Sequence, residues 1–131
     1  MKKLVTLAIP VLFATALVAG DTNPETLLKG FEAEAGSAGS ASRGMALFTG
    51  THSGGKPETP SCTTCHTSNL KGPGKTRAGK VIEPMALSVN PQRLTDQAKV
   101  EKWFRRNCNS VLGRECTAQE KADVVAYLMS L

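Results

Sequence analysis

The sequence predicts one all-α domain, and three observations support this prediction. Apolar residues recur at helical spacing in four segments, no segment alternates polar and apolar residues as a strand does, and no internal repeat is visible. The 131 residues contain no apolar run of about 20, which excludes a polytopic membrane protein, and the chain is too short for a multidomain enzyme. With 12 Gly, 7 Pro and 5% aromatic residues, the chain supplies little material for a core, so we expect another group to complete it.

The first twenty residues have the organisation of an export signal. Two lysines form a basic start, an apolar stretch runs from Leu4 to Ala19, and small residues precede an expected cleavage site before Asp21. A membrane anchor is the alternative, but Pro10 interrupts an apolar run of only about 17 residues, which is short for a membrane span. We therefore expect residues 1–20 to be a signal peptide and residues 21–131 to form a mature periplasmic domain.

The charge balance argues against a nucleic-acid partner. Cleavage would lower the formal net charge from +5 to +3, because it removes two lysines and no acidic residue. A nucleic-acid-binding protein would show a denser basic patch with interleaved aromatic residues. Export would also place the four cysteines in an oxidising compartment, where free thiols tend to pair.

Two helices are expected in the first half of the chain. Residues 24–35 open with a capping Asn and a Pro and carry apolar residues at helical spacing, and a shorter helix is expected over residues 43–49. The stretch from 50 to 60 is rich in turn residues, and residues 67–93 show no sustained period. We expect that second stretch to be a solvated loop.

Two further helices are expected near the carboxyl terminus. The third begins at Thr95 and carries apolar residues at positions i, i+3 and i+4. The fourth opens with a capping box, because Thr117 can accept from the backbone while Glu120, three residues later, reaches back.

One motif carries a specific chemical signal. The segment Cys62-Thr63-Thr64-Cys65-His66 has the form CxxCH, the attachment sequence for c-type haem. Two cysteines on one helical turn can form thioethers to the two vinyl groups of one porphyrin, and His66 is then held beneath the iron as proximal ligand. A thioredoxin-type CxxC would require a βαβ pattern, and a zinc site would require two more ligands at a second motif; neither is visible.

The other ring nitrogen of His66 needs an orienting partner. A backbone carbonyl usually supplies it, and the carbonyl of Pro73, shortly after the motif, is a candidate. The alternative is that Pro73 only shapes a turn.

Four residues are candidates for the sixth iron ligand: Met85, His52, Met129 and Asn107. Met85 follows a proline, as the thioether ligand of an ordinary electron-transfer cytochrome would. His52 lies in a Gly-rich loop, where a solvated histidine is expected, and Met129 is most simply a core residue of the last helix.

Asn107 is a candidate because of helix geometry. With Val100 at 0°, Trp103 falls near 300°, Phe104 near 40° and Asn107 near 340°, at about 100° per residue. The opposite side carries basic residues: Lys99, Lys102, Arg105 and Arg106. A carboxamide at the end of an apolar stripe needs a partner, and the iron is one. The alternative is that Asn107 ends the helix by bonding to the backbone. If the helix continues that far, Asn109 would be solvated.

Two cysteines remain after haem attachment. Cys108 and Cys116 are expected to form a disulfide in the periplasm, which would also restrain the neighbouring Asn107. The alternative is two free thiols.

With these residues assembled, the chain resembles the sphaeroides haem protein family of monohaem class I cytochromes c. The resemblance spans nearly all of the chain from Asp21 onward and includes TPSCTTCH, TRAGK, VEKWFRRNCNSVLGREC and EKADVVAYL. It implies a class I cytochrome c fold with one covalent haem, Asn107 as sixth ligand, and Cys116 as the disulfide partner of Cys108.

The resemblance also implies a function. It implies that the asparagine leaves the iron on reduction, so that ferrous haem binds O2 or NO, and that a dihaem cytochrome c is the redox partner. An amide oxygen is a hard, weak donor that suits ferric iron better than ferrous iron. A thioether from Met85 would instead favour ferrous iron and exclude gases, which would make the protein an ordinary electron carrier.

Two further functions are considered for the haem protein, gas sensing and enzyme activity. A gas-sensing module is a third hypothesis, although no output domain is present, and no dedicated general acid or base identifies an enzyme of oxygen or nitric oxide chemistry.

Basic residues of the loop and of the third helix are expected to be solvated or to steer an acidic partner: Lys71, Lys75, Arg77, Lys80 and the face from Lys99 to Arg106.

Overall fold

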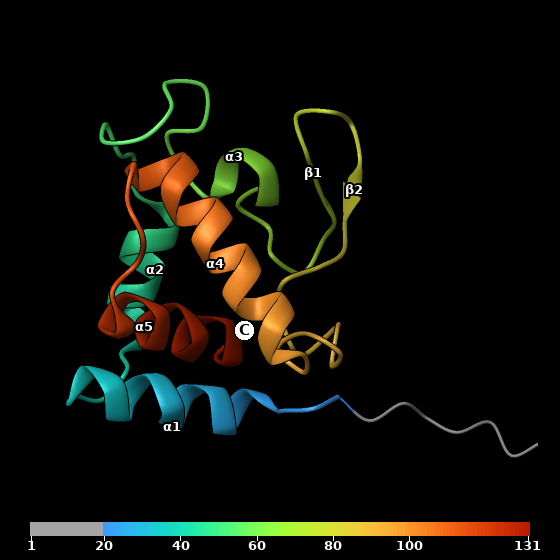
Figure 1. Cartoon of the computed structure of the whole chain (residues 1–131). Coiled ribbons are helices and arrows are strands. Elements are labelled where there is room, and N and C mark those ends of the chain that lie inside the picture. Colours follow the sequence, from blue (N-terminus) through green and yellow to red (C-terminus); the bar gives the residue numbers. More distant parts are fainter. Residues whose placement is uncertain (1–19) are drawn as a thin grey trace, which may run out of the picture.

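The computed structural model describes residues 20–131, so the expected signal peptide lies outside the described residues except for Gly20. The elements of the described region, in chain order, are α1 (Pro24–Ala35), α2 (Ala41–Thr49), α3 (Thr63–His66), β1 (Gly74–Lys75), β2 (Val81–Ile82), α4 (Gln97–Leu112) and α5 (Ala118–Met129) (Figure 1). None of the helices in this region is long and apolar enough to cross a bilayer. The all-α prediction is confirmed.

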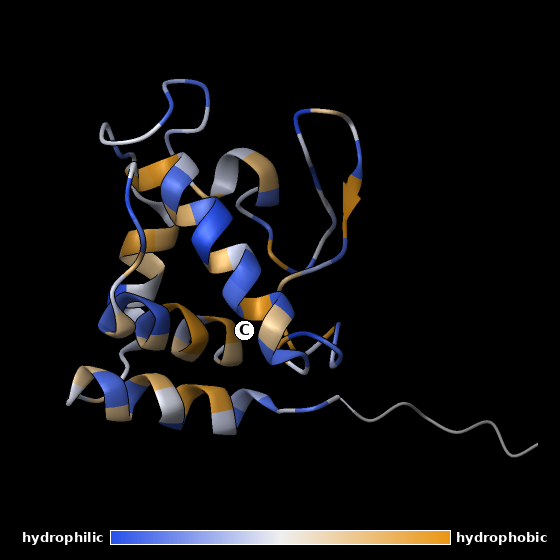
Figure 2. Cartoon of the chain, viewed as in Figure 1, coloured by the Kyte–Doolittle hydropathy of each residue, from blue (hydrophilic) through white to orange (hydrophobic). Residues whose placement is uncertain are grey.

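α5 packs closely against both α1 and α2 (Figure 1). The core of this layer includes the buried side chains Leu27, Phe48, Val125 and Leu128, and Figure 2 shows hydrophobic segments on all three helices. Only glycine fits at position 44, because a Cβ there would lie 1.9 Å from the carbonyl oxygen of Asp123. The backbones of α2 and α5 therefore approach closely enough for side chains to interlock.

A buried carboxylate fastens α2 to α5. Asp123 accepts hydrogen bonds from the backbone N–H of Ser40 at 2.7 Å, from Nε and Nη2 of Arg43 at 2.8 Å each, and from Nε2 of Gln119 at 3.0 Å. Burial tends to raise the pKa of Asp123, but the hydrogen bonds outweigh it and hold the pKa below the ordinary value. The charge is thus fully compensated inside the layer.

The helix boundaries follow the caps. α1 matches its prediction, α2 begins two residues earlier than predicted because Ser40 accepts from the N–H of Arg43 at 3.3 Å, and α4 begins at Gln97 because Asp96 is its N-cap. The predicted capping box of α5 is present: Thr117 Oγ1 accepts at 3.1 Å, and the carboxylate of Glu120 accepts in return at 2.8 Å.

A short hairpin interrupts the stretch that was predicted to be loop throughout. β1 and β2 pair antiparallel, with Gly74 opposite Ile82 and Lys75 opposite Val81. The turn is closed by the N–H of Thr76, which donates to the carbonyl of Lys80 at 2.8 Å, and Gly79 adopts a φ of 83°. Strands of two residues are too short to show an alternating pattern, which is why the sequence did not reveal them.

α4 is attached mainly at its ends. It makes almost no close backbone contact with the other helices and strands of the described region. Its first N–H donates to Asp21 at 3.0 Å, and near its end the carbonyl of Ser110 accepts from the N–H of Lys56 at 2.8 Å. In its middle, Phe104 meets Phe31 edge to face, with ring centroids 5.8 Å apart. The middle of α4 is thus joined to the rest by side chains alone.

Candidate functional site

The CxxCH segment forms one helical turn, as predicted. Cys62 precedes α3, and its carbonyl accepts from the N–H groups of Cys65 at 3.3 Å and His66 at 3.1 Å. The turn is anchored by the buried Ser61, whose hydroxyl donates to the carbonyl of Phe48 at 3.2 Å. The structure therefore brings the two thiols and the imidazole together on one short, fixed element.

The first thiol of the motif is not prepared for thiol exchange. Cys62 and Cys65 are half-buried and are not joined by a disulfide. Burial raises the pKa of Cys62 to about 11, so its thiol stays protonated at neutral pH. A redox CxxC depends on a thiol of lowered pKa, so Cys62 lacks the property that the attacking thiol of a thioredoxin-type site requires.

His66 carries a neutral imidazole. Burial, together with the positive charge of Arg93, lowers the pKa of His66 to about 4. The ring lies against Phe48, with centroids 5.6 Å apart, and its Nδ1 is buried without a hydrogen-bond partner among the described residues. Neutral imidazole is the form that binds iron, and Nδ1 is the ring nitrogen for which an orienting partner was expected.

The proposed orienting role of Pro73 is wrong, because its carbonyl does not accept from Nδ1 of His66. The segment nevertheless passes directly beside the motif. A Cβ on Gly74 would lie 2.3 Å from the carbonyl oxygen of Cys65 and 2.9 Å from the Cα of His66. The chain after Pro73 therefore supports α3 by backbone packing rather than by a hydrogen bond.

These residues fit a covalently attached haem. Two half-buried thiols lie one helical turn apart beside a neutral histidine. This is the donor set that thioether attachment and axial ligation require.

Three of the four candidates for the sixth ligand have other contacts. Nε2 of His52 bonds to the carbonyl of Leu47 at 2.8 Å, and its backbone N–H donates to Pro60 at 2.7 Å, so the half-buried His52 ties a loop to the end of α2 rather than being solvated. Met85 and Met129 are partly buried and pack against the hydrophobic core.

Asn107 lies within α4 and does not end it. The helix continues to Leu112 and is closed by Gly113, whose φ is 72°, so the alternative of a helix-ending asparagine is wrong. Asn107 is half-buried, and its carboxamide makes no hydrogen bond to another described residue. Asn109, which is exposed as predicted, instead donates to the carbonyl of Arg105 at 2.7 Å.

The neighbouring residue is covalently fixed. Cys108 is buried and forms a disulfide with Cys116, with Cα atoms 5.6 Å apart. The expected bond is therefore present and the alternative of two free thiols is wrong. The disulfide ties the segment that follows α4 to the last part of α4 itself, at the residue next to Asn107.

Two features of the site region were not predicted. Trp103 was placed on the apolar stripe of the third helix, but it is 41% exposed. Arg93 is half-buried near His66, and its guanidinium donates to the carbonyl of Pro84 at 2.8 Å and to that of Glu83. No local pattern marks Arg93, because its position depends on how the loop folds back.

Comparison with known proteins identifies the family. Residues 34–128 match the family model described as "Domain of unknown function (DUF1924)". The chain is 54% identical over 122 residues to the cytochrome c-type protein SHP of Cereibacter sphaeroides, covering 93% of this chain and 95% of the relative. It is 36% identical over 127 residues to cytochrome c'' of Methylophilus methylotrophus, covering 92% and 88%.

Solved structures agree. The fold matches the structure described as oxidized SHP, an oxygen binding cytochrome c, with a TM-score of 0.83 and 56% identity over 86% of this chain and all of the other. It also matches the solution structure of cytochrome c'', described as giving insights into haem-ligand detachment, with a TM-score of 0.65 and 34% identity over 82% and 93%. The chain therefore belongs to the family of the sphaeroides haem protein SHP, as a c-type cytochrome of class I fold with one covalently attached haem.

Proposed function

We propose that the protein is a periplasmic monohaem cytochrome in which one iron ligand is released on reduction. Cys62 and Cys65 attach the haem, His66 is the proximal ligand, and Asn107 is the sixth ligand of the ferric state. When Asn107 leaves, the ferrous protein binds a diatomic ligand, O2 or NO. Residues 1–20 direct export, and residues 21–131 form the mature protein.

The haem-attachment roles rest on the chemistry of α3. Bound haem would supply one-electron redox chemistry and an iron that accepts ligands from the protein. The thiols of Cys62 and Cys65 stand one turn apart, and His66 is held neutral by burial and by the charge of Arg93. A neutral imidazole needs no proton loss before it coordinates iron.

The carboxamide of Asn107 is the observation that carries the proposal. It is half-buried in the interior of α4 without a hydrogen bond to a described residue. Val100 and Phe104, on the same side of the helix, pack against the core. The carboxamide is therefore not engaged by another described residue, and iron coordination would give it a partner on the side of α4 that packs against the core.

The chemistry of the amide accounts for its release. An amide oxygen is a hard and weak ligand, which binds ferric iron better than the softer ferrous iron. The helix and the Cys108–Cys116 disulfide would limit how far Asn107 moves, so its NH2 group could donate a hydrogen bond to a diatomic ligand.

The descriptions of two related structures support this proposal. SHP is described as an oxygen binding cytochrome c, and haem-ligand detachment is described for cytochrome c''. Extended to this chain, these properties agree with an asparagine ligand that dissociates. We further propose that the electron donor is another cytochrome, a dihaem cytochrome c by the family resemblance.

Optical spectroscopy of the haem-loaded protein tests the ligand assignment. Spectra are recorded for the oxidised protein, after anaerobic reduction, and after addition of NO. The wild type is expected to become high-spin on reduction and to respond to NO at once. Asn107→Ala should lose the low-spin ferric signal, whereas the matched control Asn109→Ala, two residues away on the exposed face, should keep the wild-type spectra.

The competing assignment makes Met85 the ligand and the protein a simple electron carrier. It predicts a thioether-to-iron charge-transfer band in the oxidised state, a low-spin reduced state and no response to NO. Met85→Leu would then open the iron, while Asn107→Ala would leave it closed. That pair of results would reject the Asn107 proposal.

A further inference from the structure

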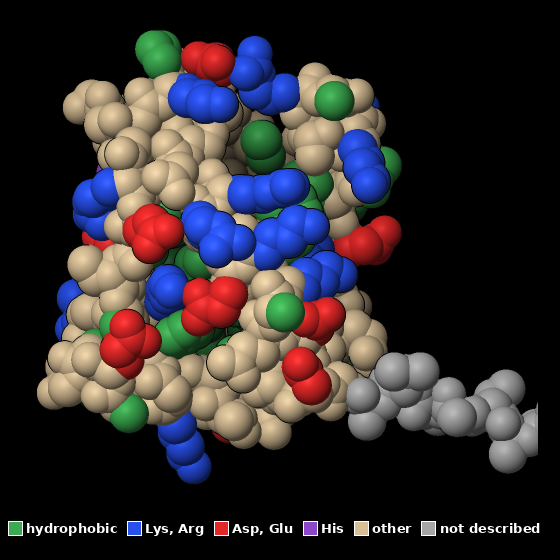
Figure 3. All heavy atoms as spheres, viewed as in Figure 1, with side chains coloured by type: hydrophobic (Ala, Val, Ile, Leu, Met, Phe, Trp, Pro, Cys, Tyr) green, Lys and Arg blue, Asp and Glu red, His purple; other side chains and the backbone are tan. Residues whose placement is uncertain are grey.

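The outer side of α4 carries an ordered set of residues. Lys99, Lys102, Trp103 and Arg106 stand at positions i, i+3, i+4 and i+7, and all four are exposed. Residues at these spacings share one face of a helix, and this face is called the α4 stripe below. Figure 3 shows basic side chains gathered across the middle of the molecule, over α4.

Trp103 is the apolar centre of the α4 stripe. Its side chain is 41% exposed although it is the largest apolar residue in the chain. Nζ of Lys102 lies 5.7 Å from the ring centroid and Cζ of Arg106 lies 5.5 Å from it. An aromatic ring between two cations is the composition of a protein interface, where Trp and Arg supply most of the binding energy.

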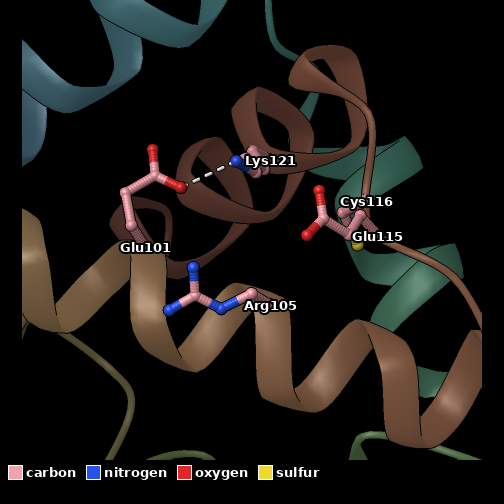
Figure 4. A pocket seen from close by; sticks show the side chains of 5 residues that line it. All are labelled: Glu101, Arg105, Glu115, Cys116 and Lys121. Atoms are coloured by element: carbon pink, nitrogen blue, oxygen red, sulfur yellow. Dashed lines mark hydrogen bonds and ion pairs between the residues drawn. The ribbon is translucent and has the colours of Figure 1, made fainter.

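The positive charges of the α4 stripe are not neutralised within the described region. None of the salt bridges found there involves Lys99, Lys102 or Arg106. The other flank of the same helix is different. There Glu101 pairs with Lys121 at 2.7 Å, and Arg105, which itself forms no salt bridge among the described residues, lines a cavity of about 80 Å³ together with the carboxylates of Glu101 and Glu115 (Figure 4).

We infer that the α4 stripe is the docking surface for a carboxylate-rich face of an electron-donor protein. This inference rests on the proposed function, in which Asn107 is an iron ligand. Trp103 stands four residues before Asn107, one turn along α4. A partner seated on the α4 stripe therefore lies beside the helix that coordinates the iron. One electron leaves the donor and reduces ferric to ferrous iron.

An acidic protein fits the α4 stripe better than a lipid surface or a nucleic acid does. The mature chain carries a net charge of only +3, and the α4 stripe is one helix face wide with a single aromatic residue. Glu101 and Glu115 lie at the cavity on the other flank of α4, next to the α4 stripe. A broad anionic surface would be repelled by these two carboxylates. A small carboxylate patch on a protein would contact only the cations of the α4 stripe.

Stopped-flow reduction of the ferric, haem-loaded protein tests the inference. The probe is fully reduced flavodoxin, an acidic protein that donates one electron, and an uncharged hydroquinone serves as the control reductant. The variants are Arg106→Gln on the α4 stripe and Arg105→Gln on the other flank of α4. These neighbours have the same residue type and the same change of charge. Lys99→Gln/Lys102→Gln/Arg106→Gln and Trp103→Ala complete the set.

At low ionic strength, the triple variant should be reduced by flavodoxin at least about tenfold more slowly than wild type and should lose most of the salt dependence. Arg106→Gln should slow reduction about threefold, and Arg105→Gln should stay within about 1.5-fold of wild type. Trp103→Ala should weaken complex formation about tenfold or more. The hydroquinone should reduce every variant at the wild-type rate.

Equal effects of Arg105→Gln and Arg106→Gln would overturn the inference, because net charge and not the α4 stripe would then govern the rate. It is overturned equally if the hydroquinone rates fall in parallel, or if phosphatidylglycerol vesicles bind the wild type tightly while flavodoxin kinetics are unchanged in the triple variant. Failure of the ligand assignment is separate, since it shows in the reduced and NO spectra whatever the flavodoxin rates are.

Discussion

The layer of α1, α2 and α5 and the region of α3, the hairpin and α4 are built in different ways. In the layer, helices touch backbone to backbone at Gly44, apolar side chains are fully buried, and the charge of Asp123 is compensated by three partners. In the second region, α4 has almost no close backbone contact with other elements of the described chain, and Val100 and Phe104 are only partly buried.

The difference shows which part of the protein is held together by direct helix-to-helix packing. A helix attached at its ends and by a few side chains has little intrinsic reason to stay in place. The partly buried residues Val100 and Phe104 of α4, together with Cys62 and Met85, pack against the same hydrophobic core as the residues of the helical layer. We propose that the bound haem would supply further apolar packing to this region, in keeping with the small aromatic content of the sequence.

Loss of the thioether bonds should produce the largest effect. In Cys62→Ala/Cys65→Ala, purified without haem, we expect the hydrogen-exchange protection of α4 amides to fall by about 1,000-fold or more relative to the haem-loaded wild type, because α4 then lacks the packing that the haem would supply. Protection in α5 should fall much less. If α4 and α5 lose protection equally, the two regions are one cooperative unit and the distinction between them is wrong.

The buried carboxylate of the helical layer gives the next largest effect. We expect Asp123→Asn to lower the free energy of unfolding by about 3 kcal/mol, because the bonds from Arg43, Ser40 and Gln119 lose their charged acceptor. Chemical denaturation of the haem-loaded protein measures this. Asp96→Asn is the matched control, since Asn caps a helix as well as Asp does, and it should change stability by less than about 0.5 kcal/mol.

The same carboxylate sets a pH dependence. The hydrogen bonds hold the pKa of Asp123 below its unfolded value of 3.8, so the unfolded chain takes up the proton first. The stabilisation is therefore complete above about pH 5 and is lost as the pH falls through the folded pKa. Asp123→Asn should remove this part of the acid destabilisation. An unchanged stability profile below pH 4 would mean that other carboxylates control it.

The disulfide at the end of α4 should have an intermediate effect. Cys108→Ser/Cys116→Ser should lower the free energy of unfolding by about 2 to 3 kcal/mol, by removing a constraint on the unfolded chain. Wild type with the bond chemically reduced is the control and should match the variant. A ferric spectrum that also loses low-spin character would indicate that the bond holds Asn107 in place.

The smallest effect is expected at His52. His52→Ala should cost about 1 kcal/mol, the value of its bond to the carbonyl of Leu47, and should leave the spectra unchanged. His52→Gln, which keeps a donor, is the control and should recover part of that stability. A changed ferric spectrum in His52→Ala would mean that His52 reaches the iron after all.

Much of the fold was predictable from local sequence. The capping box of Thr117 and Glu120, the helical turn of CxxCH and the bond between Cys108 and Cys116 depend on residues fewer than ten positions apart. Local geometry largely determines such features. The fold class followed from helical periodicity for the same reason. The β1–β2 hairpin was missed because its strands are too short to carry a pattern.

The sequence by itself determined where the helices lie and which residues could hold a haem. The tertiary structure decided what else surrounds them: that His52 is engaged by Leu47, that Trp103 is exposed, and that Arg93 approaches His66. These outcomes arise from contacts between segments far apart in the chain. Helical periodicity states which side a residue is on, but only packing between distant elements decides whether that side is covered.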